Sequence, residues 1–390
     1  MTEPTIVMTL MVRDEADVVA AMIEHHLAQG VDLIIATDNG SVDGTREILA
    51  DYVGTGRVEL HDYLEHDKKQ SQVVSAMASR AATEHGATWV VNADADEFFV
   101  AVDPSLTLRD ALRATPTGIG SFAVPVTNLT GVPARRGAAF ERLVWRDLRE
   151  EATLMETVAL HAHPTSDVIH VGRAGVRVQQ GNHGVDIPSM GAPDPAHAIE
   201  VLHLPWRTYE QYSRKIDHMG RAYEASTTLN PSPRHHGMRD YRFLRAGHLE
   251  ALYVVRHPDE EPGEGFEHEP RLWTSLRELV EHGRAMRPER LEPALTGSWH
   301  GYGAEERIHA EQVARIVIPL ELEHLAASTR WRDLYRAEAA GHRRATQELE
   351  RRGDGGLPRA RRFAARVVRA VLRRVRGLLR RVRRLLPGQD

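Results

Sequence analysis

The first hundred residues alternate between two kinds of hydrophobic pattern. Short runs of apolar and β-branched residues, typical of strands, are followed by segments whose apolar positions recur every three or four residues, as in helices. Val19, Ile23 and Leu27 show the helical spacing, and Gly30 follows where such a helix should end. The pattern predicts strands at 5–12, 33–37, 58–60 and 88–92, and helices after residue 14, at 45–52 and at 70–85.

Strands that alternate with helices through short connections are typical of a parallel sheet covered by helices. The run 88–92 is apolar enough to be buried on both faces, as a central strand of such a sheet must be. Asp14 is expected to cap the first helix. Because ligands of such sheets bind beyond the carboxyl ends of the strands, the sequence predicts an α/β fold with its site at the strand ends.

The rest of the chain has a mixed pattern. Strands are expected at 121–127 and 176–179, and a helix is expected at 207–223. Residues 256–270 are rich in Glu, Pro and Gly, which favours a loop or lid, and 304–351 is helical in character. We predict a main domain over 1–255 with two halves, 1–100 and 101–255, a loop and helical extension over 256–352, a linker over 353–358 and a tail over 359–390.

The composition excludes several kinds of site. The chain has 390 residues, of which 42% are hydrophobic, and this is enough for a sizeable core. It has no cysteine, which excludes disulfides, thiolate zinc sites, iron–sulfur clusters and a thiol nucleophile. No run reaches the roughly 18 apolar residues of a membrane-spanning helix, and the start of the chain is typical of a strand rather than a signal peptide.

The formal net charge of -5 conceals an uneven distribution. Residues 359–384 hold 12 arginines and no acidic residue, so the body of the chain is acidic. Apolar residues recur every three or four positions opposite these arginines, as in an amphipathic helix on an anionic membrane. Nucleic-acid binding and a solvated extension are alternatives, but aromatic residues that would stack on bases are missing beyond Phe363. We expect a cytoplasmic protein held by this tail on the inner face of the plasma membrane.

Polar residues cluster where three of the predicted strands end. Arg13 and Asp14 follow the first strand, and Asp38 follows the second. Asp94 and Asp96 follow the fourth. Carboxylates this close raise one another's pKa unless a cation neutralises them, and oxygen ligands suit Mg²⁺ or Mn²⁺. The alternatives are a solvated acidic loop and, at the second strand, an ordinary turn, because Asn-Gly and Asp-Gly are strong turn signals.

Three longer motifs contain these clusters: MVRDEADVVAAMIEHHLAQGVD, TDNGSVDGT and WVVNADADEFF. In this order and spacing they resemble the family 2 glycosyltransferases of the GT-A type, in the bacterial branch with an Asp-Ala-Asp-Glu-Phe motif. The resemblance covers about the first hundred residues with high specificity. It continues more weakly through QGNHGVD and HLPWRTYEQYSRKI, and it ends near residue 255.

The resemblance implies a GT-A fold and a nucleoside diphosphate sugar, most often a UDP-sugar, lying across the strand ends. Asp38 would hydrogen-bond the base, and Arg13 would lie beside the nucleoside. Asp94 would approach the ribose or the metal, and Asp96 would bind the Mn²⁺ or Mg²⁺ ion that bridges the diphosphate. Gln70 would contact the donor, the alternative being an ordinary glutamine at a helix start.

Three later residues are further candidates for the donor site. In GT-A enzymes a histidine after the acceptor region often completes the metal site, and His203 is the candidate here. Arg207 and Lys215 lie eight residues apart, nearly on one helical face, and would meet the diphosphate. The alternative for this pair is a solvated amphipathic helix.

Inverting transfer needs a general base that takes the proton of the acceptor hydroxyl as it attacks the anomeric carbon. Family members generally use a carboxylate of the acceptor segment, which makes Asp186 the first candidate and His183 the second. We expect metal-dependent, inverting transfer to a saccharide or lipid-linked acceptor, in which the ion stabilises the departing nucleoside diphosphate.

Two other functions stay open at this point. A sugar-phosphate nucleotidyltransferase shares the α/β fold and acidic ligands, but it should carry a glycine-rich basic loop where this chain has Arg-Asp-Glu-Ala-Asp. A non-catalytic nucleotide- or sugar-binding module anchored by the tail would have no need of the pair Asp94 and Asp96.

Overall fold

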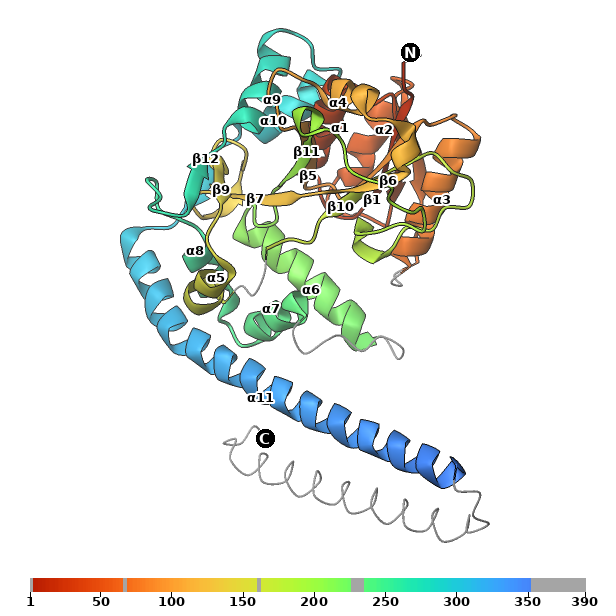
Figure 1. Cartoon of the computed structure of the whole chain (residues 1–390). Helices are drawn as coiled ribbons and strands as arrows, with labels where there is room; N and C mark the ends of the chain where they lie inside the picture. Colours follow the sequence, from red (N-terminus) through yellow and green to blue (C-terminus); the bar gives the residue numbers. More distant parts are fainter. Residues whose placement is uncertain (1–2, 66–68, 160–162, 226–234, 352–390) are drawn as a thin grey trace. The chain divides into compact units, whose positions relative to one another are not determined.

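Four strands from the first hundred residues lie next to one another in the larger sheet. The computed structural model describes residues 3–65, 69–159, 163–225 and 235–351. The strands of this sheet are β1 (Ile6–Val12), β2 (Leu33–Asp38), β3 (Val58–Asp62), β4 (Trp89–Ala93), β6 (Ser121–Val124) and β10 (Asp167–Val171). Their order is β3-β2-β1-β4-β10-β6 (Figure 1), parallel from β3 to β4 and antiparallel around β10. This confirms the predicted α/β class with a mostly parallel sheet.

The period of two along the strands puts apolar side chains on both faces of this sheet. Met8 of β1 belongs to the core beneath α1 (Val19–Ala28), whereas its neighbour Val7 belongs to the core beneath α3 (Gln70–Thr83). The core beneath α1 also contains buried side chains of α2 (Thr45–Val53), α4 (Leu108–Ala114), α9 (Arg271–Glu281) and α10 (Pro288–Thr296). The compact unit therefore continues past the predicted division at residue 255 and ends at Leu325.

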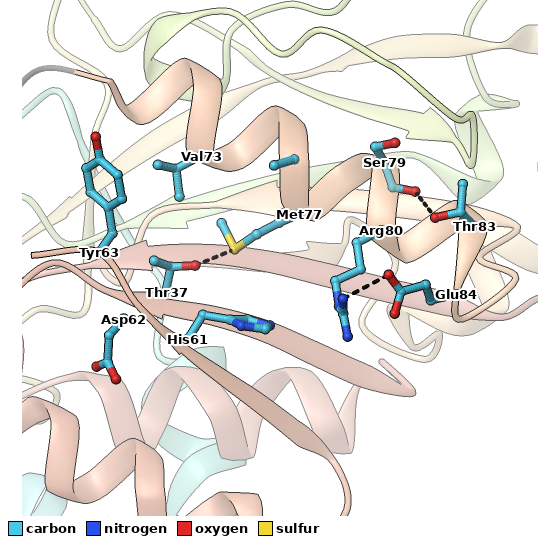
Figure 2. A pocket seen from close by; sticks show the side chains of 11 residues that line it. Thr37, His61, Asp62, Tyr63, Val73, Met77, Ser79, Arg80, Thr83 and Glu84 are labelled. Carbon is cyan, nitrogen blue, oxygen red and sulfur yellow. Dashed lines mark hydrogen bonds and ion pairs between the residues drawn. The ribbon is translucent and has the colours of Figure 1, made fainter.

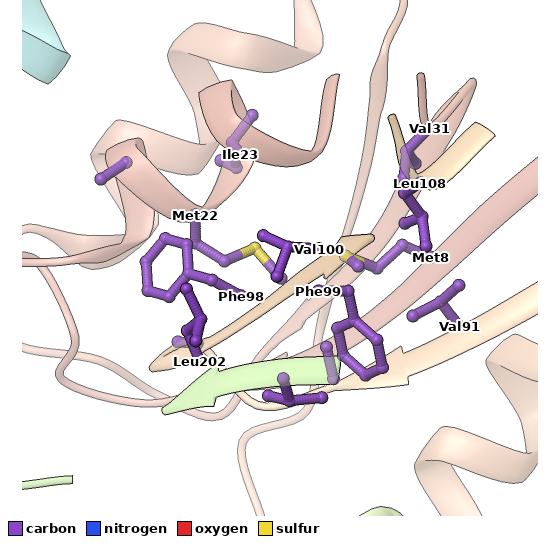
Figure 3. Close-up of a cluster of buried hydrophobic side chains, with 14 of the residues drawn as sticks. Met8, Met22, Ile23, Val31, Val91, Phe98, Phe99, Val100, Leu108 and Leu202 are labelled. Atoms are coloured by element: carbon purple, nitrogen blue, oxygen red, sulfur yellow. The ribbon is translucent and has the colours of Figure 1, made fainter. Parts of the chain in front are cut away.

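A second sheet shares the core beneath α1. Its strands are β5 (Glu97–Ala101), β7 (Val126–Thr130), β9 (Trp145–Asp147), β11 (Ile199–His203) and β12 (Phe266–His268), in the order β12-β9-β7-β11-β5. Figure 3 shows Phe98 of β5 beside Leu202 of β11 and Met22 of α1, all in this core. Because β4 ends at Ala93 and β5 begins at Glu97, the turn over residues 94–96 connects the two sheets.

Three predictions of local structure were wrong. The single strand expected at 121–127 is divided at Pro125, which lacks an N–H, into β6 and β7 of different sheets. The strand expected at 176–179 is only an isolated bridge between Val178 and Val185. Asp14 does not cap α1: Val18 precedes that helix, and Asp14 has a φ of 53° because it belongs to a tight loop after β1.

Helices of the later chain form a core of their own. It joins α5 (Glu151–Val158), α6 (Tyr209–Ala225), α7 (His236–Arg245), α8 (Leu249–Arg256) and the first part of α11 (Ala304–Arg351). α6 corresponds to the helix predicted at 207–223, and α11 corresponds to the one predicted at 304–351. The remaining elements are the strand pair β8 (Ala134–Gly137) and β13 (Trp299–Gly301) and the 3₁₀ turns η1 (Thr117–Ile119), η2 (Gln180–Asn182) and η3 (Pro195–His197).

The second compact unit begins at Ala326 and includes the later part of α11. The predicted linker at 353–358 and tail at 359–390 lie outside the described residues, so the membrane-binding role of the tail stays a prediction. Within the described ranges, no helix is both long and apolar enough to span a bilayer.

Packing of α6 on α7 requires a glycine. A β-carbon at Gly220 would lie 2.1 Å from the ring of the buried Tyr241. We expect Gly220→Ala to destabilise the protein by about 1–3 kcal/mol, because overpacking outweighs the roughly 1 kcal/mol by which alanine favours a helix. Urea unfolding measures the change. The control is Gly118→Ala, where a β-carbon would meet nothing within 4 Å; equal losses in both variants would contradict the packing argument.

Candidate active site at the strand ends

The loops that follow β1 and β2 are joined by hydrogen bonds. The backbone N–H of Val42 donates to Oδ1 of Asp14 at 2.8 Å, and the backbone N–H of Glu15 donates to the hydroxyl of Thr45 at 2.8 Å. Neighbouring parallel strands end at the same edge of a sheet, and these bonds fix the two loops against each other there. The strand ends therefore form one continuous polar surface.

Asp38 is the last residue of β2 and is almost completely buried. Its Oδ2 atom accepts hydrogen bonds from the backbone N–H groups of Gly40 and Ser41, both at 3.0 Å. Its Oδ1 atom is buried as well and has no hydrogen-bond partner among the described residues. A buried acceptor without a donor costs free energy in the ligand-free protein, so this atom is suited to accept a hydrogen bond from a ligand.

Arg13 lies beside this position, at the end of β1. Its side chain is partly exposed, and its Nε atom lies 3.6 Å from Oδ2 of Asp14. Since β1 and β2 are adjacent and parallel, Arg13 and Asp38 lie at the same edge of the sheet.

The two aspartates of the turn between the sheets face different partners. Oδ1 of Asp94 accepts hydrogen bonds from the side-chain amides of Gln70 at 3.2 Å and Asn182 at 3.1 Å. Oδ2 of Asp96 lies 2.7 Å from Nζ of Lys215 and 3.8 Å from Nε2 of His203. The predicted site residues Gln70, His203 and Lys215 thus all come to this turn, although they belong to three separate elements.

Arg207 provides a second counter-charge for the turn. It lies between β11 and α6 and has no exposed surface. Its guanidinium donates to Oδ2 of Asp96 at 3.4 Å, to Oδ2 of Asp17 at 2.7 Å and to the carboxylate of Glu15. Arg207 is therefore a partner of the acidic residues and not, in this structure, a cation that faces solvent.

Basic side chains of α6 lie along the strand ends. Arg214 lies 3.5 Å from Asp43, and His218 lies 3.4 Å from Asp14. With Lys215 they form a row of nitrogen-bearing side chains, each opposite a carboxylate. The alternative considered from the sequence, a solvated amphipathic helix, does not describe Arg207, which is buried, whereas the side chain of Lys215 is 43% exposed.

Burial and charge separate the pKa values of the acidic residues. Burial would raise the pKa of Asp96, but Lys215, His203 and Arg207 together hold that pKa well below its usual range. Burial and the neighbouring Asp96 raise the pKa of Asp94 to about 6. Burial, followed by the charges of Asp94 and Asp167, raises the pKa of Glu97 well above its usual range.

The residues at this turn fit a divalent ion that is bound jointly with a substrate. Within the described residues, no group of three or more histidine and carboxylate side chains is arranged to hold a metal by itself. Mg²⁺, however, is commonly held by one or two carboxylates together with substrate phosphates and waters. Oδ2 of Asp96 and Nε2 of His203 lie 3.8 Å apart, so a carboxylate and an imidazole meet on one side of the turn, while the carboxylate of Asp94 is turned toward Gln70 and Asn182.

The two candidates for the general base have different surroundings. Asp186 is bound by Arg173 and by the backbone and side chain of Arg177, and these contacts lower its pKa. His183 is partly exposed, and its Nδ1 atom lies 3.3 Å from Oδ1 of the buried Asp167.

Four residues of the site were not anticipated. Glu15 and Asp17 stand in the same acidic string as Asp14, so that string already contained a signal for them. Asn182 precedes His183 in a motif that the sequence singled out. Asp167 has no such signal, because it is an isolated aspartate at the start of β10.

Comparison with known proteins agrees with the enzyme class expected from the sequence. Residues 6–129 match the family model of glycosyltransferase family 92. This match confirms the predicted class, a glycosyltransferase. The finer prediction, family 2, stays a prediction, because the matched model is that of another family. A search of curated proteins gave no match.

Solved structures align with the chain only loosely. TarS 1–349 of S. aureus, crystallised with UDP, aligns with a TM-score of 0.32 and 11% identity over 80% of this chain and 88% of that one. Glucosyl-3-phosphoglycerate synthase from Mycobacterium tuberculosis, crystallised with Mn²⁺, UDP and glucosyl-3-phosphoglycerate, aligns with a TM-score of 0.24 and 14% identity over 66% and 81%. These scores are too low to support an argument about this chain.

A cavity of about 590 Å³ lies between α3 and the strands β2 and β3. Figure 2 shows Thr37, Met77 and Arg80 around it. None of the site residues predicted from the sequence lines this cavity. Its Arg80 is already paired with Glu84 at 2.8 Å, so we do not assign the donor to it.

The pairing of Arg207 gives a test of stability. We expect Arg207→Met to destabilise the protein by about 3–5 kcal/mol, because it removes the buried guanidinium that pairs with three carboxylates. The matched control is Arg214→Met, which removes a partly exposed ion pair and should cost less than about 1 kcal/mol. Urea unfolding of both variants measures the difference. Similar losses for the two would mean that Arg207 does not hold the carboxylates together.

Proposed function

We propose that this glycosyltransferase moves a sugar from a UDP-sugar to a saccharide or lipid-linked acceptor, with a divalent ion and inversion at the anomeric carbon. One observation carries the proposal. Asp38 ends β2 and Asp96 lies in the turn after β4, at the same edge of the sheet with β1 between them. Asp38 has a buried oxygen without a donor, and Asp96 is surrounded by cations. A nucleotide base can donate a hydrogen bond to the buried oxygen of Asp38, and a diphosphate can bind to the cations around Asp96.

The base is assigned to Asp38. The uracil ring has an N–H group between two carbonyls, and this N–H would donate to the unpartnered Oδ1 atom. Arg13, at the end of the adjacent strand, would lie beside the nucleoside, and Gln70 would contact the donor near Asp94. Hydrogen bonds to charged groups contribute about 1.5–3 kcal/mol each, which is enough to select a base.

The diphosphate is assigned to the face of α6. Lys215 is a compact cation on a flexible stem, and its side chain is 43% exposed, so it can turn from Asp96 to a phosphate oxygen. Arg207 is fully buried and holds three carboxylates, so it would act on the donor only through Asp96.

Asp96 and His203 would hold the ion, Mn²⁺ or Mg²⁺. Bound there together with the diphosphate, the ion would offset the negative charge that develops on the leaving nucleoside diphosphate. Lys215 must release Asp96 when this happens, and its own charge then remains next to the phosphates. The Asp-Ala-Asp-Glu-Phe motif, on which the family 2 prediction rests, supports this assignment.

Calorimetry of UDP binding with and without Mn²⁺ tests the site. We expect UDP to bind more tightly with Mn²⁺ and Asp38→Asn to weaken this binding by about 10- to 100-fold, since the lost hydrogen bond is to a charged group. In Asp96→Asn the effect of Mn²⁺ should disappear. The matched control is Asp62→Asn, because Asp62 is paired in register with Asp38 on β3 but is exposed.

The outcomes of this titration differ in what they exclude. Unchanged UDP affinity of Asp96→Asn in Mn²⁺ would contradict the assigned ion site. A preference for GDP would contradict the uracil assignment and leave the diphosphate site intact. If neither nucleotide binds, with or without Mn²⁺, the proposed donor site is wrong.

A further inference from the structure

Asp186 is occupied by a structural role. Its carboxylate binds the guanidinium of Arg173, accepts from the backbone N–H of Arg177 at 2.9 Å and lies 3.3 Å from Nε of the same residue. These bonds connect residues 173–177 to the segment after the 180–183 turn. A carboxylate that already accepts from two arginines is a weak proton acceptor, because every bond favours its charged form.

The 180–183 turn, in contrast, is attached to the donor side of the site. Asn182 donates to Oδ1 of Asp94 at 3.1 Å, and Gln180 donates to Gln70, which itself donates to Asp94. His183 follows Asn182 directly, and its ring is close enough to Asp94 for the two to interact electrostatically. Its side chain is 41% exposed, which leaves it accessible to an incoming hydroxyl.

Asp167 is the buried carboxylate that lies next to this histidine. It begins β10, has no exposed surface, and neither of its oxygens meets a well-aligned hydrogen-bond donor within the described residues. The Nδ1 atom of His183 lies 3.3 Å from its Oδ1. The other ring nitrogen, Nε2, lies over Gly181, where a β-carbon would come within 2.8 Å.

We infer that His183 and Asp167 form the general-base pair of this site. His183 is the catalytic residue, which takes the proton of the acceptor hydroxyl at Nε2. Asp167 is a positioning residue, which accepts from Nδ1–H and so fixes the tautomer whose Nε2 is unprotonated. The inference rests on the proposed sugar transfer, and it replaces Asp186 as the first candidate.

The step balances in atoms and charge. The acceptor oxygen forms a bond to the anomeric carbon, its proton passes to Nε2, and the bond between the anomeric carbon and the diphosphate oxygen breaks. The nucleoside diphosphate leaves with the electron pair of that bond. The imidazolium formed beside the carboxylate of Asp167 then returns its proton to water.

The surrounding charges agree with this role. Asp167 of β10, followed by the more distant Asp94 of the turn between the sheets, raises the pKa of His183 above its usual value of 6.5 although burial opposes this. Neutral His183 is the active form, so kcat should rise with pH through this pKa. Asp167→Asn removes the largest cause of the shift, and the acid limb of the profile should move to lower pH.

Histidine NMR on the full chain tests the pair without requiring turnover. The signal of His183 is assigned as the one that disappears in His183→Gln. We expect its titration to move to lower pH in Asp167→Asn and to stay in place in Asp186→Asn. An unchanged titration in Asp167→Asn would overturn the pairing.

Turnover tests the role as a base. UDP release from UDP-glucose or UDP-N-acetylglucosamine is followed, and we expect kcat to fall about 100-fold or more in His183→Gln and about tenfold or more in Asp167→Asn, with KM for the donor unchanged. The double variant should be no slower than His183→Gln, because the two residues act as a unit. The control is His282→Gln, an exposed histidine at the end of α9.

These results separate the inference from the function on which it rests. An equal or larger loss of kcat in Asp186→Asn than in His183→Gln would overturn the inference while sugar transfer stands. A wild-type protein that neither binds UDP nor releases it would contradict the proposed function instead. In that case the inferred role of His183 as a base fails with it, whereas the NMR titration still decides the pairing with Asp167.

Discussion

The guanidinium group of Arg207 compensates carboxylates that distant parts of the chain bring to one edge of the sheet. Glu15 and Asp17 follow β1, Asp96 lies in the turn between the sheets, and Arg207 precedes α6. Charges removed from water are tolerated only when each has a partner in good geometry. Arg207 therefore connects the 94–96 turn to the loop after β1, next to the start of α6.

Lys215 differs from Arg207 in a way that suits a binding site. Both contact Asp96, but the side chain of Lys215 is partly exposed and ends in a single compact charge, whereas Arg207 is enclosed. The ligand-free site thus has one permanent and one exchangeable counter-charge. In the proposed function, an ion and a diphosphate replace the second counter-charge and leave the first in place.

Local patterns were sufficient to predict the four parallel strands β1 to β4 of the larger sheet and the acidic residues at their ends, but not β10, and β6 only as part of a longer strand. An apolar run such as 88–92 indicates a buried strand, and Asp94 and Asp96 then follow at the carboxyl end of that strand. Ion pairs between residues far apart in the chain could not be predicted from local patterns. Arg207 and Glu15 are 192 residues apart, and Arg207 was assigned from the sequence to the diphosphate rather than to a buried ion pair. Asp167 was not predicted as a site residue, because only the pairing of β10 with β4 brings it near the site.

A crystal structure with UDP and Mn²⁺, with anomalous differences recorded at the manganese edge, tests the central claim most directly. The account predicts an anomalous peak next to Oδ2 of Asp96, the uracil N–H against Oδ1 of Asp38, and the ammonium of Lys215 moved from Asp96 to a phosphate oxygen. Uridine in the cavity between α3 and β3, or manganese away from Asp96 while Lys215 keeps its ion pair, would contradict it.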